Sequence, residues 1–438
     1  MSTINPFALA LTLFMGLLII ILPRKLAIVP MIIIALYQTF GQQIIIFELN
    51  FYMLRILMLF GIFRIIFREG IYSISLNPID KAILWWLAVT IITYSLARQT
   101  SDALINRLGF AYNVIGTYFF FRFLICDIDD INRVFKIIAI LIVPIAFIML
   151  YESRTGTNPF AVFGGVLTDS ELRNGIPRCQ GPFGHPILAG TFGATLVPLF
   201  VSFWWQSLSG KIFACVGIIA AMIITVTSNS SGPVMTLLFA VVGLSVWPIR
   251  NHMKAVRWGL CLTLLALHFF IMKAPVWYLT ARISEMMGSG GGWYRSYLIE
   301  QTVNHFNEWW FIGAKDTAIW MPFSLSGYPG QADITNQFVA EGVNGGLVKL
   351  ILFILILVRC FQGLGERLRV TDDREFPTKI FLWAMGSALL AHIVSFFSVS
   401  YFDQIYVFWY LLLACISTVS LFPKSIELSE NVHAEATL

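Results

Sequence analysis

The chain has 438 residues, of which 58% are hydrophobic and 12% are charged, and its mean hydropathy is +0.79. A soluble domain carries about 25% charged residues, so the composition excludes an ordinary soluble globular protein. The net charge of +5 is expected to reflect cytoplasmic loops that contact anionic membrane lipid. We therefore expect a membrane partner and no nucleic-acid partner.

Apolar runs of the length that crosses a bilayer as a helix, about 20 residues, recur along the chain. The first, at 5–22, lacks the basic start and small-residue end of a cleavable signal peptide and is interpreted as a retained span. The short run at 51–67 contains Arg55 and Arg64, so the sequence predicts an all-α polytopic membrane protein with twelve or thirteen spans. The remaining runs lie near 26–46, 79–97, 109–126, 134–151, 187–206, 212–229, 232–249, 258–274, 345–361, 379–398 and 404–422.

The basic residues predict the orientation, because cytoplasmic loops are enriched in Lys and Arg. With the N-terminus outside and the C-terminus inside, most of the 29 Lys and Arg residues fall on the cytoplasmic side. The connection from Arg98 to Arg107 then lies outside, against the rule. Two long segments, 152–186 and 275–344, also lie outside.

These boundaries divide the chain into six parts. They are N-terminal spans (1–151), a first long periplasmic loop (152–186), central spans (187–274), a large periplasmic loop (275–344), C-terminal spans (345–422) and a cytoplasmic tail (423–438).

Long loops in compact proteins are usually functional or disordered, and the aromatic, glycine and arginine content of the two long loops favours order. We therefore expect the functional site in these two loops.

Arginines dominate the basic residues of the two long loops, although these loops lie on the side expected to be poor in cations. A guanidinium suits bidentate contact with phosphate. Arginines from two distant loops can converge on one anionic group at the membrane surface, or they can be solvated charges paired with nearby acids. They are Arg154, Arg173, Arg178, Arg282 and Arg295.

The stretch RCQGPFGHP, residues 178–186, leads from the first loop into a span. Its glycines permit tight turns, and Pro186 suits the first turn of a helix. Arg178 and His185 are thus expected near a helix N-terminus, where backbone N–H groups favour anions. His185 is either a proton-transfer group or a polar helix cap.

The stretch DITNQFVAEGVNGGL, residues 333–347, leads from the second loop into another span. A carboxylate just above the membrane can act as a general base for a sugar hydroxyl. Asp333 can instead be a helix N-cap, with Gln337 near the capping-box position. Glu341 lies near the lipid boundary, where an ionisable residue is harder to explain as structural.

These stretches, in this order, resemble those of the O-antigen ligase and O-antigen polymerase family of bacterial surface polysaccharide assembly. RCQGPFGHPILAG is similar to the family's Arg, Gly, aromatic and Pro before a span of small residues, and TSNSSGP to its short Thr-Ser-Arg-Gly-type turn. GGWYRSYLIEQTVNHFNEWWFIGAKD is similar to its Arg-led helix, and DITNQFVAEGVNGGL to its closing motif. The resemblance covers about residues 150–360. Thr335 replaces the His that ligases carry in the closing motif, which favours a polymerase.

The resemblance implies a membrane-embedded, GT-C-like glycosyltransferase of the bacterial inner membrane, without cofactor or metal. It would polymerise undecaprenyl-diphosphate-linked oligosaccharide repeats into an O-antigen or exopolysaccharide on the periplasmic face, with a glycan donor, a glycan acceptor and other polysaccharide assembly proteins as partners. The alternatives are an O-antigen ligase, a lipid-linked glycan transporter or flippase, and a non-catalytic assembly subunit.

The resemblance also implies roles for individual residues. The expected ligands of the diphosphate and glycan are Arg178, Arg295, Arg173, Arg282 and Asn336. The expected candidates for the base that deprotonates the acceptor hydroxyl are His185, Asp333 and Glu341.

Overall fold

The structure is a computed structural model that describes residues 5–46, 49–69, 75–286, 291–321 and 333–421. Within these ranges the chain is almost entirely helical, and seven helices are long and apolar enough to cross a membrane. Three further apolar helices are shorter. This agrees with the predicted all-α polytopic class.

The N-terminal third contains six helices and one short antiparallel hairpin, in which Gln43 lies opposite Tyr52. The elements are α1 (Pro6–Ile21), α2 (Val29–Tyr37), β1 (Gln43–Ile46), β2 (Leu49–Tyr52), α3 (Met53–Arg64), a π-helical turn (Ile65–Glu69), α4 (Pro78–Arg98), α5 (Ser101–Leu124) and α6 (Ile128–Thr155).

The central part alternates long helices with the first long loop. Its elements are a 3-10 turn (Pro159–Phe163), β3 (Leu172–Arg173), β4 (Ile176–Pro177), α7 (Pro186–Ser202), a 3-10 turn (Phe203–Trp205), α8 (Leu208–Thr227), α9 (Ser231–Ser245), a 3-10 segment (Trp247–His252) and α10 (Met253–Ala266) with a π-helical end (Leu267–Ile271).

The last part begins with short helices and ends with three long or apolar ones. Its elements are a 3-10 turn (Val276–Tyr278), α11 (Leu279–Met286), α12 (Gly291–Asn304), α13 (Phe306–Trp309), a 3-10 turn (Ala318–Trp320), α14 (Gln337–Val343), α15 (Gly346–Val370), α16 (Phe376–Phe396) and α17 (Ile405–Val419).

The predicted span at 26–46 is wrong as a single helix. α2 ends at Tyr37, and the chain then turns into the β1–β2 hairpin. The cause is the polar stretch that follows, in which Gln38, Thr39 and Gln42 are buried. Gln38 donates to the carbonyl of Ala8, so α2 ends on a hydrogen bond to α1.

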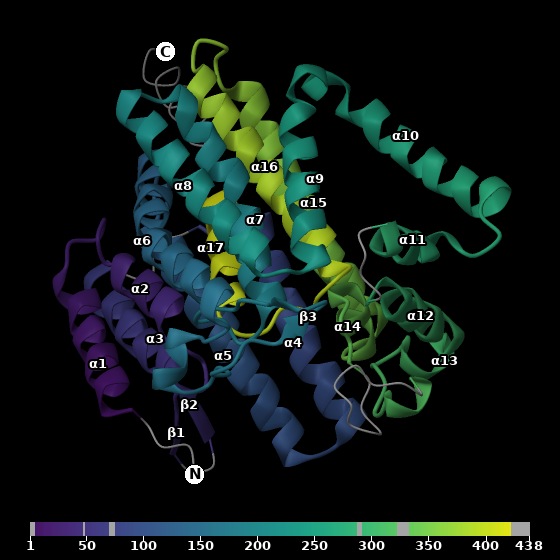
Figure 1. Ribbon diagram of the computed structural model, residues 1–438, viewed down its shortest axis with the longest axis horizontal. Helices are drawn as coiled ribbons and strands as arrows, with labels where there is room; N and C mark the ends of the chain where they lie inside the picture. The colour runs from purple at the N-terminus through teal and green to yellow at the C-terminus, as the bar shows by residue number, and fades with distance from the viewer. Residues whose placement is uncertain (1–4, 47–48, 70–74, 287–290, 322–332, 422–438) are drawn as a thin grey trace, which may run out of the picture.

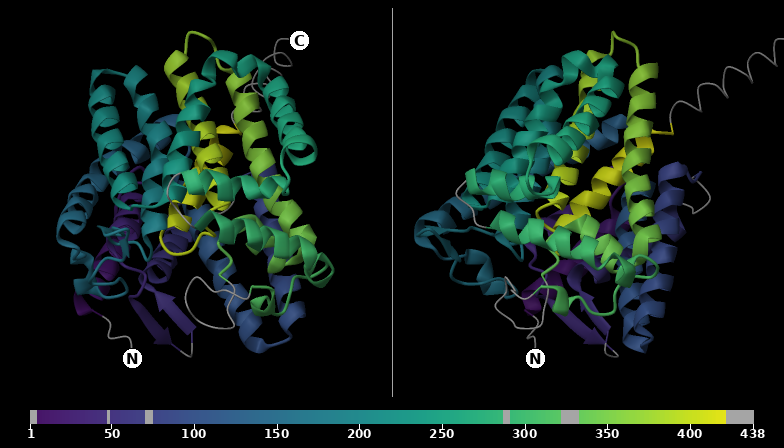
Figure 2. Two further views of the ribbon diagram at one scale, coloured as in Figure 1. Left: turned by 45° about the vertical axis from the view of Figure 1, so that its right-hand side comes forward. Right: turned by 90° about the vertical axis from the view of Figure 1, so that its right-hand side faces the viewer.

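The helices run mostly along one direction, and Figures 1 and 2 show the β1–β2 hairpin and the α4–α5 connection at one end of the molecule. We call this the lower end, as it is drawn in Figure 1, and the opposite end the upper end. α16 and α17 run in opposite directions. α16 ends towards the lower end, and α17 runs upward from the connection that follows it.

α7 is the central helix, because nearly all of its residues are buried and it packs against α8, α9 and α16. Its glycines allow this close approach. A Cβ at Gly190 would lie 2.3 Å from Ser228 Oγ, and one at Gly193 would lie 2.6 Å from the carbonyl oxygen of Ala221. The start of α7 is therefore held rigidly against the α8–α9 turn.

α10 lies apart from the bundle in Figure 1. None of its residues is buried, and its large apolar side chains, such as Leu260 and Leu262, are exposed. In a helix of this composition, such exposure is expected where the neighbour is lipid rather than protein.

Candidate functional site

The stretch RCQGPFGHP forms a compact turn that ends at α7. Glu152, in the last turn of α6, is fully buried and accepts hydrogen bonds from the backbone N–H groups of Gln180 (3.0 Å) and Gly181 (2.9 Å). Gly181 has φ +55°, the left-handed conformation that glycine adopts without strain. Gln404 donates to the carbonyl of Pro182 at 2.6 Å. The turn is thus fixed by α6 and by the residue that precedes α17.

Arg178 lies at the start of this turn and is buried. Its NH1 donates to Glu171 Oε2 at 2.7 Å, and its NH2 donates to Ser230 Oγ at 3.1 Å. Its Nε is buried and has no hydrogen-bond partner among the described residues. A buried donor without an acceptor is costly, so this guanidinium retains binding capacity for a ligand oxygen.

The β3–β4 hairpin brings Arg173 to the same place. Asn174 and Gly175, the two residues of its turn, both have positive φ, as the Asn-Gly pair of a two-residue hairpin requires. Asn229 donates from its side-chain amide to the carbonyl oxygens of Arg173 (3.5 Å) and Ile176 (3.3 Å). The α8–α9 turn therefore holds both this hairpin and Arg178.

Arg295 reaches the cluster from the second long loop. It lies in the first turns of α12, and its Nε donates to the carbonyl of Ser398 at 3.1 Å. Ser398 in turn lies against Gly232 at the start of α9, where a Cβ would be 2.7 Å from its Oγ. Among the described residues, no carboxylate forms an ion pair with Arg295.

The electrostatics show that these arginines act on one another. Burial, followed by the charges of Arg173 and Arg178, lowers the pKa of Arg295 to about 10. The pKa of Arg178 is also lowered, by burial and then by Arg173. The expected convergence is therefore found for three arginines, which we call the arginine site: Arg173, Arg178 and Arg295. The carboxylate that pairs with it, Glu171, is partly exposed.

His185 is the N-cap of α7, and its Nδ1 accepts from the backbone N–H of Ile187 at 3.1 Å. Burial, followed by the charge of Arg178, lowers the pKa of His185 to about 4. The ring is therefore neutral near pH 7, with the proton on Nε2. Of the two alternatives, this geometry favours the helix cap, and it leaves Nε2–H as the free donor of the ring.

Asp333 is held through its backbone, whereas Asn336 is engaged through its side chain. Tyr294, the residue before Arg295, bonds to the backbone of Asp333 twice: its hydroxyl accepts from Asp333 N at 3.0 Å and donates to Asp333 O at 3.1 Å. The N-cap of α14 is Asn336, which accepts from Val339 N at 3.2 Å, so the alternative that made Asp333 this N-cap is wrong. The structure thus brings Asp333 next to α12, while Asn336 is occupied by α14.

Glu341 lies outside the arginine site, in an ion pair that the sequence did not predict. It is buried, and its Oε2 lies 3.0 Å from Lys349 Nζ and accepts from Trp86 Nε1 at 2.9 Å. Its Oε1 accepts from Gln337 Nε2 at 2.6 Å, and Gln337 Oε1 accepts from the backbone N–H of Tyr401 at 2.7 Å. Both carboxylate oxygens are therefore engaged by the protein, which favours a structural role.

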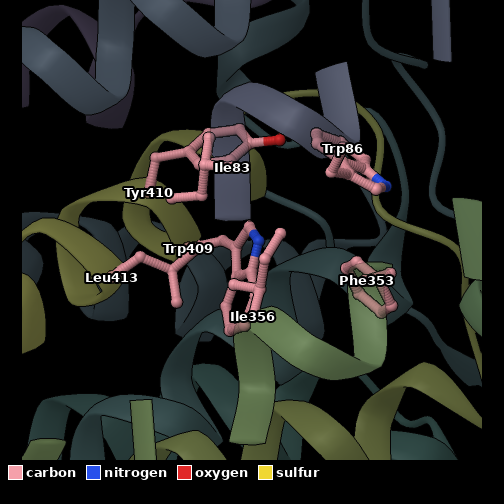
Figure 3. Close-up of a pocket in the computed structure, with 7 residues that line it drawn as sticks. All are labelled: Ile83, Trp86, Phe353, Ile356, Trp409, Tyr410 and Leu413. Carbon is pink, nitrogen blue, oxygen red and sulfur yellow. The ribbon is translucent and has the colours of Figure 1, made fainter. Parts of the chain in front are cut away.

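Trp86, which donates to Glu341, also lines a small cavity, whose lining residues Figure 3 shows. Its volume of about 10 Å³ is close to the least that a single water requires. The cavity is too small for a sugar. It is lined by Ile83, Trp86, Phe353, Ile356, Trp409, Tyr410 and Leu413.

Arg282 is not part of the arginine site. It is exposed on α11, and its nearest ionic partner is Glu285, one turn later, at 3.5 Å. The sequence reasoning offered Glu171 as one of the acids that could pair with a loop arginine, and it pairs with Arg178. Three other contributors to the site were missed: Glu152, Ser230 and Ser398. For Ser230 a signal existed, since the resemblance aligned the α8–α9 turn with a turn that often carries an arginine.

No family model and no curated protein sequence matches the chain. A function must therefore be argued from the chemistry of the arginine site.

Proposed function

We propose that the protein is a membrane glycosyltransferase that polymerises undecaprenyl-diphosphate-linked oligosaccharide repeats at the periplasmic face of the bacterial inner membrane. The observation that carries this proposal is the arginine site. Three guanidiniums from two loops act on one another, only Arg178 is paired with a carboxylate, the partly exposed Glu171, and the buried Nε of Arg178 has no partner among the described residues. The site has an excess of positive charge that a diphosphate would neutralise.

The reaction requires cleavage of the bond between the anomeric carbon of the donor sugar and the diphosphate oxygen. Negative charge develops on the leaving diphosphate, and fixed guanidiniums stabilise it without reorganisation. Arg178 and Arg295 hold the diphosphate in this proposal, with Arg173 beside them. His185 Nε2–H donates to the same oxygens.

The new bond forms between the anomeric carbon and an acceptor hydroxyl, whose proton passes to a base. Asp333 is our candidate for this base, because its backbone is bonded to Tyr294, next to Arg295. Glu341 is less suitable, because Lys349, Trp86 and Gln337 already occupy its carboxylate.

The proposal is tested with the full-length protein in lipid nanodiscs and an undecaprenyl-diphosphate oligosaccharide as substrate. We expect longer lipid-linked products, formed equally in the presence of a chelator. Arg178→Ala and Arg295→Ala should each lower the rate by about 100-fold or more. Arg154→Ala is the matched control, because Arg154 is exposed at the end of α6.

Three outcomes would contradict the polymerase. Transfer of the glycan to an acceptor other than a second lipid-linked repeat would indicate a ligase. Passage of unextended glycan across a proteoliposome membrane would indicate a transporter. Binding of the lipid-linked glycan without any transfer would indicate a non-catalytic assembly subunit.

A further inference from the structure

A second pair of arginines lies at the lower end of the molecule, on the α4–α5 hairpin (Figure 1). Arg98 is the last residue of α4, and Arg107 lies in the second turn of α5. The central guanidinium carbon of each lies 3.7 Å from the centroid of the Tyr94 ring. Two guanidiniums this close to one centroid must occupy opposite faces of the ring, since on one face they would overlap. Tyr94 thus holds two positive charges near each other through cation–π contacts.

The pair keeps hydrogen-bonding capacity that the protein does not use. Arg98 NH1, Arg107 Nε and the hydroxyl of Ser95 are buried and have no hydrogen-bond partner in the described ranges. Buried donors of this kind normally have a partner. An acceptor with several oxygens that binds at the edge of the Tyr94 ring can bond to both guanidiniums and to the Ser95 hydroxyl.

The neighbouring charges leave this pair unneutralised. Glu341 is the carboxylate whose charge acts on Arg107, but it is already paired with Lys349 at 3.0 Å. Asp102, in the first turn of α5, is exposed, and within the described part of the chain it forms no ion pair with Arg98 or Arg107. The local balance is therefore positive.

The two helices also expose large apolar side chains near the pair, beside the polar residues of their connection. Leu96, Leu104 and Leu108 are large, exposed and lie on the same two helices as the arginines. A free inorganic anion would gain nothing from these leucines, whereas a lipid would bury hydrocarbon against them. This also gives a reason for two arginines on the side of the membrane where the distribution of basic residues disfavours them.

We propose that Arg98 and Arg107, held by Tyr94, form a binding site for the phosphate of a lipid headgroup at the extracytoplasmic surface. The site is separate from the arginine site and does not depend on the proposed function. Two sources have this chemistry: an anionic phospholipid of the bilayer, or the diphosphate of a polyprenyl lipid.

The test measures binding to the purified full-length protein in neutral detergent, by the rise of the thermal unfolding midpoint with ligand concentration. The probes are a short-chain phosphatidylglycerol, undecaprenyl diphosphate, a short-chain phosphatidylcholine and inorganic phosphate. We expect saturable binding of one or both anionic lipids. In the double variant Arg98→Gln/Arg107→Gln their Kd should rise at least about tenfold, the loss of one charge-assisted hydrogen bond or more.

Three variants keep the test decisive. Arg154→Gln should bind as the wild type does. Tyr94→Leu keeps both arginines but removes the ring that holds them, and it should weaken binding, while Tyr94→Phe should not. If the double variant does not fold, the comparison of Tyr94→Leu with Tyr94→Phe decides the result.

The arms with the two anionic lipids identify the source, because the ligand of this site is the lipid whose Kd rises in the double variant. Undecaprenyl diphosphate that binds at the arginine site keeps its wild-type Kd in that variant. The proposal is overturned if the double variant or Tyr94→Leu binds both lipids as tightly as the wild type. It is also overturned if inorganic phosphate or phosphatidylcholine stabilises the protein as strongly as the anionic lipids. Binding is measured without turnover, so a failure here is distinguishable from a failure of the proposed reaction.

Discussion

The arginine site and the Glu341–Lys349 pair are built in opposite ways, although one segment contacts both. Residues 398–401 accept a hydrogen bond from Arg295 at one end and donate one to Gln337, the partner of Glu341, at the other. The Glu341–Lys349 pair contains one charge of each sign and occupies both carboxylate oxygens. The arginine site contains three cations, one carboxylate and an unsatisfied donor. Burial therefore does not distinguish structural from functional charge here, whereas the balance of charge does.

The largest expected effect is a loss of stability when the Glu341–Lys349 pair is broken. Glu341→Ala leaves Lys349 buried without a partner and should cost about 3–5 kcal/mol, seen as a lower midpoint of thermal unfolding. Adding Lys349→Met should recover much of the loss, because the unpaired cation is removed. Glu341→Gln separates this role from catalysis: loss of activity with an unchanged midpoint would identify Glu341 as the base and refute the structural role.

The next largest effect is expected at the arginine site, on activity rather than stability. Arg178→Lys keeps the charge but loses the planar fork that bonds Glu171 and Ser230 together. We expect the rate of chain extension to fall by at most about tenfold, as measured by product length in the nanodisc assay. The unfolding midpoint should stay unchanged. Wild-type activity in this variant would mean that the geometry of Arg178 is unimportant.

Glu152 should affect the site through the turn that it holds. Glu152→Gln places an amide where two backbone N–H groups now donate, and one orphaned N–H costs about 1–3 kcal/mol. Because the turn carries Arg178 and His185, we expect the KM for the lipid-linked donor to rise more than kcat falls. A purely structural role would lower the unfolding midpoint and leave the KM unchanged, and Glu152→Asp should retain part of the function.

His185 should make stability depend on pH in one direction. Its pKa is lowered from 6.5 to about 4 in the folded protein, so the unfolded state binds a proton first as the pH falls. The stability that the folded protein gains from a neutral His185 is present above pH 6.5 and is lost progressively as the pH falls towards 4. His185→Asn, which keeps an N-cap but cannot titrate, should show a smaller fall of the unfolding midpoint between pH 7 and pH 5. An equal fall in both proteins would contradict the shift.

The smallest effect is expected for Arg282→Ala. Arg282 is exposed and contacts Glu285 on its own helix, and such a pair contributes about 0–1 kcal/mol. Activity and the unfolding midpoint should both stay near the wild-type values. A large loss of activity would place Arg282 in the diphosphate site and would weaken the distinction between balanced and unbalanced charges.

The sequence predicted the helical class and the meeting of Arg173, Arg178 and Arg295, because loop arginines on a side poor in cations are unusual. It did not predict that Arg154 and Arg282 would stay outside, since that depends on how the end of α6 and α11 are placed by tertiary packing. It also failed for Glu341. The chain breaks between α14 and α15, where Gly346 has φ +80°, and this break lets Glu341 meet Lys349 eight residues later. Spacing along the sequence identifies neighbours only within one continuous helix, so it does not indicate this pair.

The isolation of α10 has a consequence for how the protein responds to its bilayer. Because no residue of α10 is buried against the described protein, its tilt is governed by its two connections and by the hydrophobic thickness of the surrounding membrane. A thinner bilayer should make α10 lean and a thicker one should make it stand upright, while the packing around α7 fixes the arginine site. Cys261, which is exposed on α10, gives a position for a spectroscopic label that would follow this tilt in membranes of graded acyl-chain length.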